Sequence, residues 1–236
     1  MMQTGASPTT QGLLFDKDGT LFGFQATWGG WCADLIRKLA PDAPDVQADL
    51  ARRLHLDLDR RIFLPGSSVI AGTLWESVSL MLPALEGWTA DALHGVILED
   101  SMSVAPVEAV PLAPLLQRFT QAGLLLGVAT NDSETPARAQ LAALDLEDRF
   151  AFIAGADSGF GAKPEPGQCL AFAETHGLDP ASVAMIGDST HDLRAGKLAG
   201  MQTVAVLTGV AEADELAPEA DVVLEDIGHL PEWLGL

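Results

Sequence analysis

The sequence predicts an α/β fold: a three-layer core with a parallel sheet, plus an inserted all-helical cap domain. Two features of the chain lead to this prediction. Beyond residue 107, short apolar runs alternate with helix-like segments, which is typical of βα units whose parallel sheet is covered on both faces. Residues 23–106 break this rhythm, because helical periodicity dominates them.

Six short apolar runs are the predicted strands. Runs of this length, bounded by turn-forming residues, are typical of buried strands. The predicted strands cover residues 12–15, 124–129, 151–154, 183–186, 203–207 and 222–224.

Helix-like segments lie between the later strands. Gly123, Gly177 and Gly200 directly follow three of them, at the position where glycine commonly ends a helix. The predicted helices cover residues 112–122, 136–144, 166–176 and 192–199.

The inserted segment is predicted to form a separate domain. Its helical stretches are 31–39, 46–58 and 73–85, and prolines separate them. We therefore expect residues 1–22 and 107–236 to form the core and residues 23–106 the cap, with hinges at 22–24 and 106–111. Ligands of open α/β sheets bind at the carboxyl ends of the strands, so a cap inserted after the first strand would act as a lid over that edge.

Composition and charge exclude several classes of protein. The chain carries 33 acidic and 13 basic residues, a formal charge of −20, and this argues against binding to nucleic acid or anionic membranes. The 48% hydrophobic content excludes general disorder. The longest apolar stretch, 122–130, is too short to span a bilayer, and the polar N-terminal tail does not resemble a secretory signal. With only Cys32 and Cys169, we expect a soluble cytoplasmic protein without a disulfide framework.

The segment Asp16-Lys17-Asp18-Gly19-Thr20 directly follows the first predicted strand. In an extended segment, side chains two residues apart share a face, so Asp16 and Asp18 can converge, while Gly19 permits a sharp exit. An Asp-rich turn is one interpretation of this pattern. A calcium-binding EF-hand loop is excluded, because Leu21 occupies the glycine position and Thr27 the final glutamate position.

Two further segments supply hydrogen-bond donors and a cation. Thr130 and Asn131 end the second predicted strand, where a hydroxyl and an amide could bind a phosphoryl oxygen or simply cap the next helix. Asp132 and Ser133 are the expected caps of that helix. Lys163 precedes a proline, which disfavours helix and places Lys163 on a loop.

The segment 187–192, GDSTHD, follows the fourth predicted strand and adds Asp188 and Asp192. Asp192 could either support the site or complement a helix N-terminus. His191 is expected to be an exposed loop residue. Together the four segments offer carboxylates, one cation and polar donors, which suit Mg²⁺ and phosphoryl transfer to an aspartate.

The ordered motifs DKDGT, ATN, AKP and GDSTHD resemble those of the haloacid dehalogenase-like superfamily, in particular its phosphoglycolate-phosphatase-like members with a helical cap. The motifs run from 16 to 192, and the match extends through GDSTHDLRAGKLAGM. The resemblance implies a Rossmann-like core, and it implies an enzyme, a phosphoric monoester hydrolase.

Catalytic and metal-binding roles follow from this resemblance. It implies that Asp16 is the nucleophile and Asp18 the general acid and base. Mg²⁺ would be held by the Asp16 carboxylate, the Asp18 main-chain carbonyl and Asp188, with Asp192 supporting the metal's water shell. Dehalogenases of the superfamily lack the second aspartate, and a halide leaves without a proton, so Asp18 argues against dehalogenation.

The same resemblance assigns Thr130 and Lys163 to the substrate phosphoryl group, with Asn131 as a neighbour positioned by the backbone. The implied substrate is a small phosphorylated metabolite, with 2-phosphoglycolate as the default. Two alternatives stay open: a phosphomutase similar to β-phosphoglucomutase, and a catalytically vestigial phosphate-binding protein. The sequence does not choose between monomer and dimer.

The cap region carries aromatic and basic residues whose roles stay open. Its tryptophans are expected to serve its core: Trp28, Trp31 and Trp75. Its basic residues are expected mostly to form a solvated face, with one or two contacting substrate: Arg37, Lys38, Arg52, Arg53, Arg60 and Arg61.

Overall fold

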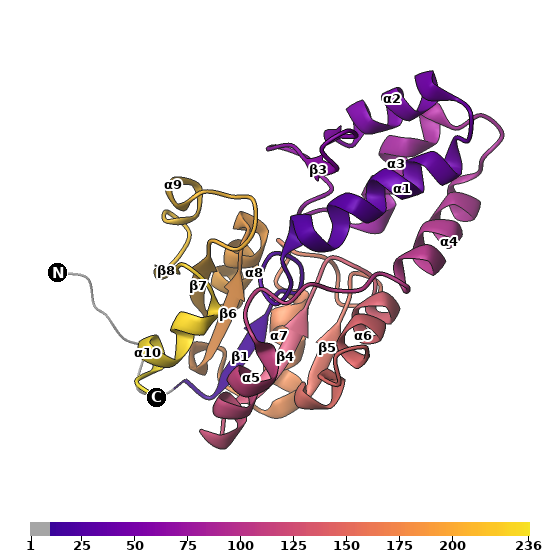
Figure 1. Cartoon of the computed structure of the whole chain (residues 1–236). Coiled ribbons are helices and arrows are strands. Elements are labelled where there is room, and N and C mark those ends of the chain that lie inside the picture. The colour runs from indigo at the N-terminus through magenta and orange to yellow at the C-terminus, as the bar shows by residue number, and fades with distance from the viewer. Residues whose placement is uncertain (1–9) are drawn as a thin grey trace.

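The structure is a computed structural model and describes residues 10–236 (Figure 1). The polar tail expected at the N-terminus falls largely on residues 1–9, outside the described part of the chain. Within residues 10–236, no helix combines the length and the apolar character needed to cross a membrane.

The core is a six-stranded sheet in which all neighbouring strands are parallel, in the order β5-β4-β1-β6-β7-β8. This confirms the predicted α/β class, and each predicted strand is present within one residue at either end. The strands are β1 (Gly12–Phe15), β4 (Leu125–Ala129), β5 (Phe152–Ala154), β6 (Val183–Gly187), β7 (Gln202–Val206) and β8 (Val222–Leu224).

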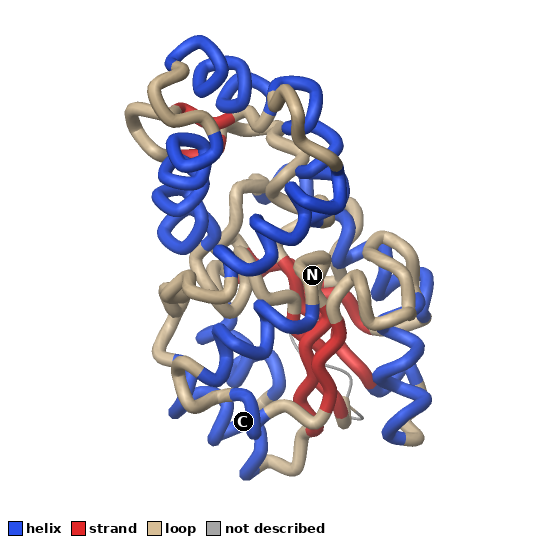
Figure 2. Tube along the Cα trace, turned by 90° about the vertical axis from the view of Figure 1, so that its right-hand side faces the viewer, coloured by secondary structure: helices blue, strands red, loops and turns tan. Residues whose placement is uncertain are grey.

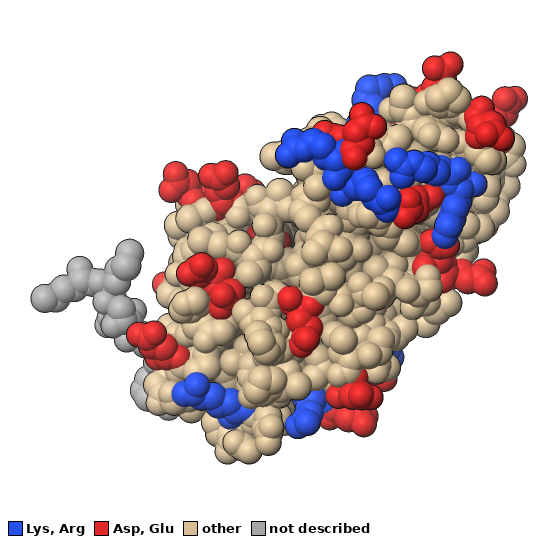
Figure 3. Space-filling view, in the orientation of Figure 1, with Lys and Arg blue, Asp and Glu red and all other residues tan. Residues whose placement is uncertain are grey.

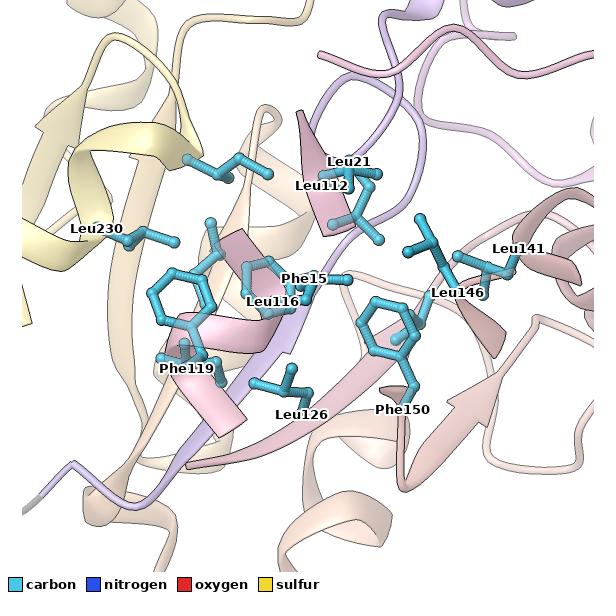
Figure 4. Packing of buried hydrophobic residues seen from close by; sticks show 14 of the residues in the cluster. Phe15, Leu21, Leu112, Leu116, Phe119, Leu126, Leu141, Leu146, Phe150 and Leu230 are labelled. Carbon is cyan, nitrogen blue, oxygen red and sulfur yellow. The ribbon is translucent and has the colours of Figure 1, made fainter. Parts of the chain in front are cut away.

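The alternation of side chains along β1 divides the core into two apolar layers. Leu13 and Phe15 pack on one face, where the rings of Phe15, Phe119 and Phe150 meet (Figure 4). Leu14 points to the opposite face and belongs to a separate cluster. All three β1 side chains are fully buried, as expected of a central parallel strand.

Helices cover both faces of the sheet and complete the three layers. The face with Phe15 is covered by α5 (Leu112–Gln121), α6 (Glu134–Ala142) and α10 (Leu230–Leu234). The other face is covered by α7 (Gly167–His176), α8 (Thr190–Ala199) and α9 (Ala213–Leu216). Short 3₁₀ turns lie at Glu147–Arg149, Pro180–Ser182 and Ile227–His229. Gly123, Gly177 and Gly200 follow three helices with positive φ angles of 82°, 64° and 80°, as predicted.

The segment between β1 and α5 is mainly helical, and Figure 2 shows it as a separate layer over one end of the sheet. A π-helical turn at Gln25–Gly29 leads into α1 (Gly30–Leu39). It is followed by α2 (Pro44–Arg53), α3 (Leu74–Met81), a 3₁₀ turn at Leu82–Ala84, and α4 (Ala90–Ser101).

The expectation of an all-helical insertion, with a helix over 46–58, was wrong in one place. The helix ends at Arg53, and a two-stranded antiparallel hairpin follows, formed by β2 (Leu56–Asp57) and β3 (Ile62–Phe63). His55 takes a φ of 49° and turns the chain out of the helix. The leucines that follow recur every second residue, at 54, 56 and 58, which is the period of a strand.

The two connections between the insertion and the core lie side by side. The Gly23 amide donates to the Val107 carbonyl at 2.8 Å, and the Ala109 amide donates to the Leu21 carbonyl at 2.9 Å. The insertion has its own apolar cluster, which runs from Phe24 to Val104. These observations support the proposed division into core (1–22 and 107–236) and cap (23–106); that the connections act as hinges stays a prediction.

Candidate active site

The end of β1 places Asp16 at the carboxyl edge of the sheet. Its amide donates to the Ile186 carbonyl at 2.8 Å, which continues the sheet pairing by one residue. Its carboxylate Oδ1 lies 2.6 Å from the Lys163 ammonium, although the two residues are 147 positions apart. Burial raises the pKa of Asp16 to about 7, against the opposing effect of the Lys163 charge.

Lys163 is buried on a loop, with its side chain only 2% exposed, and points into the site as expected. Its ammonium contacts Asp16 Oδ1 and Asp192 Oδ1, each at 2.6 Å, and the Ala129 carbonyl at 2.7 Å. Burial alone would disfavour the charged form, but the two carboxylates outweigh it and raise the pKa of Lys163. Lys163 therefore stays protonated and ties the ends of β1 and β4 to α8.

Asp188 and Asp192 complete a carboxylate cluster with Asp16. One oxygen from each lies within 4.8 Å of the others, and all three residues are buried. Burial, reinforced by the charges of Asp16 and Asp192, raises the pKa of Asp188 well above its usual value. Asp192 also forms a reciprocal capping box with Ser189 at the start of α8, so its helix-terminal role is shown.

Gly19 is required where the chain leaves β1. Its φ is +89°, and a Cβ at this position would lie 2.2 Å from Asp188 Oδ2. A side chain would therefore be strained and would collide with the carboxylate. The glycine thus lets the turn pass directly beside Asp188.

The Asp18 carboxylate faces two partners that the sequence did not reveal. Trp28, from the π-helical turn of the cap, donates from Nε1 to Asp18 Oδ1 at 2.6 Å. Lys17 lies 2.6 Å from Asp18 Oδ2. Trp28 was expected only in the cap core; it is 8% exposed and belongs to that core, but it also reaches the site.

Lys17 is fully buried, which is unusual for a lysine. Its ammonium also contacts Asp132 at 3.2 Å and donates to Gln140 Oε1 on α6 at 2.6 Å. Burial opposes its charge, but Asp18 and Asp132 outweigh burial and raise the pKa of Lys17. One signal could have identified it: a lysine between two aspartates, at a buried strand end of a strongly acidic chain.

Thr130 and Asn131 lie at the end of β4, as predicted, and are 2% and 8% exposed. Asn131 is already engaged: its Nδ2 donates to the carbonyls of Ala71 at 2.8 Å and Lys163 at 2.9 Å. Its Oδ1 accepts from the Lys163 amide at 2.8 Å. The Asn131 side chain therefore joins β4, the Lys163 loop and the cap.

Two smaller expectations near the site were wrong. His191 is the second residue of α8 rather than an exposed loop residue; it is half-buried, and its Nδ1 lies 3.2 Å from the Ala71 carbonyl. Asp132 does not cap α6 but pairs with Lys17, and Ser133 makes no capping hydrogen bond there. Asp157 instead accepts from the Glu134 amide at 2.8 Å. Both differences arise because loops distant in sequence offer these groups alternative partners.

The tryptophans and the basic residues of the cap lie in different surroundings. Trp31 packs edge to face on Trp28 and donates to Asp100, whereas Trp75 is 50% exposed and stacks on His94, so the expectation of a core role fails for Trp75. The basic residues of the cap lie outside the lining of the cavity over the site: Arg37, Lys38, Arg52, Arg53, Arg60 and Arg61.

The donor set fits a divalent cation. Oxygens of three carboxylates lie within 4.8 Å of one another, the Lys163 ammonium contacts only Asp16 and Asp192 among them, and burial raises the pKa of Asp16 and Asp188. Carboxylate oxygens are the ligands that Mg²⁺ prefers. The Asp18 side chain is not part of this cluster, and its expected main-chain role stays a prediction.

Comparisons with known proteins identify similar hydrolases. Residues 98–206 match the family model of haloacid dehalogenase-like hydrolases. A phosphoglycolate phosphatase from Rhodospirillum rubrum is 34% identical over 121 residues, which are 51% of this chain and 50% of that protein. The chain thus spans about half the length of the curated relatives it matches.

Solved structures resemble almost the whole chain. A haloacid dehalogenase-like hydrolase from Bacteroides fragilis covers 94% of this chain and 99% of its own, with a TM-score of 0.70 and 21% identity. A protein assigned as a β-phosphoglucomutase from Thermotoga maritima covers 94% and 96%, with a TM-score of 0.66 and 19% identity. The matched segment and the shared fold make the chain similar to haloacid dehalogenase-like hydrolases.

Proposed function

We propose that this protein is a Mg²⁺-dependent phosphatase that hydrolyses a small phosphorylated metabolite through an aspartyl-phosphate. One observation carries the proposal: at the carboxyl edge of the sheet, the Asp16 carboxylate contacts the Lys163 ammonium at 2.6 Å, and an oxygen of a second buried carboxylate, Asp188, lies within 4.8 Å of an Asp16 oxygen. The R. rubrum relative, named as a phosphoglycolate phosphatase, supports the substrate class.

In the proposed first step, Asp16 attacks the phosphorus of the bound ester. Lys163 holds Oδ1 of Asp16, so Oδ2 would form the new bond to phosphorus while the bond to the ester oxygen breaks. Asp18 would give its proton to the departing oxygen. Trp28 and Lys17 contact the two oxygens of Asp18 and so set the orientation of this acid.

In the proposed second step, Asp18 accepts a proton from water as the water attacks the phosphorus. The bond between Asp16 and phosphorus breaks, and inorganic phosphate and the free carboxylate result. Lys163 would also neutralise a phosphoryl oxygen, and the Thr130 hydroxyl, at the end of β4 in the lining of the same cavity, would bind another. Mg²⁺, held by Asp16, Asp188 and the Asp18 carbonyl with support from Asp192, would supply the remaining positive charge.

Replacing Asp16 by Asn tests the nucleophile. We expect Asp16→Asn to abolish phosphate release from p-nitrophenyl phosphate, because an amide cannot form the acyl phosphate, while circular dichroism shows a folded protein. Asp91→Asn, on the exposed start of α4, is the matched control and should keep wild-type activity. Activity of Asp16→Asn close to wild type would contradict the assignment.

The chelator experiment tests the cation. Phosphate release should stop when EDTA is added and return with excess Mg²⁺; turnover that persists in EDTA would contradict the proposed ligand set.

The phosphomutase alternative has one specific support, the shared fold with the T. maritima protein. A mutase uses the same aspartyl-phosphate but returns the phosphoryl group to a sugar, so a bisphosphate primer separates the two functions. Phosphate release without primer favours the phosphatase, and isomerisation that requires primer favours the mutase. Phosphate binding without either reaction would indicate a vestigial site.

A further inference from the structure

A single cavity joins the candidate site to the interior of the cap. Its volume is about 110 Å³, and its lining includes Asp16, Asp18 and Lys163 on the core side. On the cap side, α1, α3 and α4 contribute Leu35, Met81 and Ile97, which are only 2–3% exposed. The alcohol part of an ester whose phosphate lies at Asp16 would therefore face this cap wall.

The cap wall is apolar and offers few free polar groups. Leu54 and Phe63 extend it, and both are 2% exposed. The Ser77 and Ser101 hydroxyls donate to carbonyls of their own helices, at 3.4 Å and 2.8 Å. Burial raises the pKa of the Cys32 thiol to about 12, so it is neutral at physiological pH. A polar leaving group would find little to replace its lost water here.

The indole N–H groups of the wall are engaged as well. Trp28 donates to Asp18, and Trp31 donates to Asp100 at 2.7 Å. Their rings therefore present carbon surface to the cavity.

Charge in the cavity disfavours a second anion. Among the described residues, Lys163 is the one Lys or Arg in the lining, and Asp16 and Asp192 already bind it. The basic residues of the cap gather on its outer face over α1, α2 and the β2–β3 turn, interleaved with acidic ones (Figure 3). Arg37 and Arg61, for example, both pair with Asp34. His191 lines the core side of the cavity, so a carboxylate on the leaving group would lie against the apolar cap wall with no further lysine or arginine to pair with.

We propose that the substrates are phosphate monoesters of compact, uncharged, apolar alcohols, and that an anionic leaving group such as glycolate is a poor fit. This inference rests on the proposed phosphatase function. The cavity of about 110 Å³ is smaller than an apolar cavity of about 150 Å³ that binds benzene, and it must also hold the phosphoryl group, so it suits a short branched chain.

Two esters of matched shape provide the test. In 2-methylpropyl phosphate, two methyl groups occupy the positions of the two carboxylate oxygens of 2-phosphoglycolate. With Mg²⁺ present, we expect kcat/KM for 2-methylpropyl phosphate to exceed that for 2-phosphoglycolate by at least about tenfold. The reason is that only 2-phosphoglycolate would bury a carboxylate against the apolar wall. A ratio of one or below overturns the inference, although the phosphatase function then stands.

A variant pair tests the wall itself. Ile97→Ala should lower the ratio of kcat/KM for 2-methylpropyl phosphate over methyl phosphate severalfold, because methyl phosphate does not reach the wall. Val96→Ala, the neighbouring residue that is 40% exposed and outside the cavity lining, should leave this ratio unchanged. Equal ratios in the two variants would contradict the wall assignment. If the wild type hydrolyses no ester at all, p-nitrophenyl phosphate included, both proposals fail.

Discussion

At the scale of single residues, the site depends on charged groups that burial forces into pairs. Lys163 is held between Asp16 and Asp192, and Lys17 between Asp18 and Asp132. Burying such a pair costs desolvation free energy, and removing one partner leaves the other charge buried and uncompensated. The two lysines therefore control where the carboxylates point as much as they stabilise the fold.

Lys17→Met tests this at the residue that sequence reasoning missed. We expect a loss of about 3 kcal/mol in the free energy of unfolding, because two carboxylates lose a cation in a buried setting. Urea denaturation measures it. Lys197→Met, which removes an ion pair from a lysine that is 58% exposed, should change stability by at most about 0.5 kcal/mol. Equal effects in the two variants would show that burial of Lys17 is unimportant.

At the scale of elements, strand ends and loops converge on one edge of the sheet. The ends of β1, β4 and β6 bring Asp16, Thr130 and Asp188 together, as expected for a parallel sheet. The turn after β3 also reaches this edge, where the Ala71 carbonyl accepts from Asn131 and contacts His191. The cap is thus attached to the site by hydrogen bonds as well as by its two connections.

Asn131→Ala tests the role of this side chain as a link. Its loss leaves the buried Lys163 amide and two carbonyls without their partner, so we expect a destabilisation of about 2 kcal/mol and faster hydrogen exchange at the Lys163 amide. Chemical denaturation and exchange measurements check both. Gln121→Ala, at the exposed end of α5, is the control. Unchanged exchange at Lys163 would indicate that the loop holds its place without Asn131.

At the scale of the whole molecule, an acidic chain concentrates part of its charge at a buried point. The net charge of −20 disfavours polyanionic partners, and three of the acids form a buried cluster suited to a cation. That cluster lies between two bodies with separate apolar cores. Stability, pH and metal binding should therefore be linked.

The linkage predicts an unusual pH dependence. Burial raises the pKa of Asp16 to about 7, so between about pH 4 and 7 the folded protein binds a proton that the unfolded chain releases. In EDTA, this group makes the protein less stable as pH rises through that window, and Asp188 acts in the same direction. We expect the melting temperature in EDTA to fall from pH 6 to pH 8.

Mg²⁺ and a variant supply the controls for this prediction. Since the cation competes with protons, Mg²⁺ should raise the melting temperature more at pH 8 than at pH 6. Asp16→Asn should show a shallower fall in EDTA, because its amide does not titrate. A melting temperature that rises between pH 6 and pH 8 in EDTA, with no difference between the variant and the wild type, would contradict the linkage.

The sequence predicted the order and type of the core elements because their signals are local. Each strand is a short apolar run, and Gly177 and Gly200 end helices whatever those helices pack against. The hairpin after α2 was missed because three leucines there fit a helical interpretation nearly as well as a strand. Trp75 was misassigned because its exposure depends on neighbours that are distant in the sequence.

The sequence by itself determined the parallel α/β core and the placement of Asp16, Thr130, Lys163 and Asp188 at its edge, because strand direction and turn residues are encoded within a few positions. Only the tertiary structure decided what these groups contact. The pairing of Lys17 with Asp18 and Asp132, the reach of Trp28 into the site and the apolar cap wall all arise where distant segments meet and exclude water. Because water is excluded there, each buried charged group pairs with the opposite charge nearest to it in space. The spacing of residues along the sequence does not reveal which group that is.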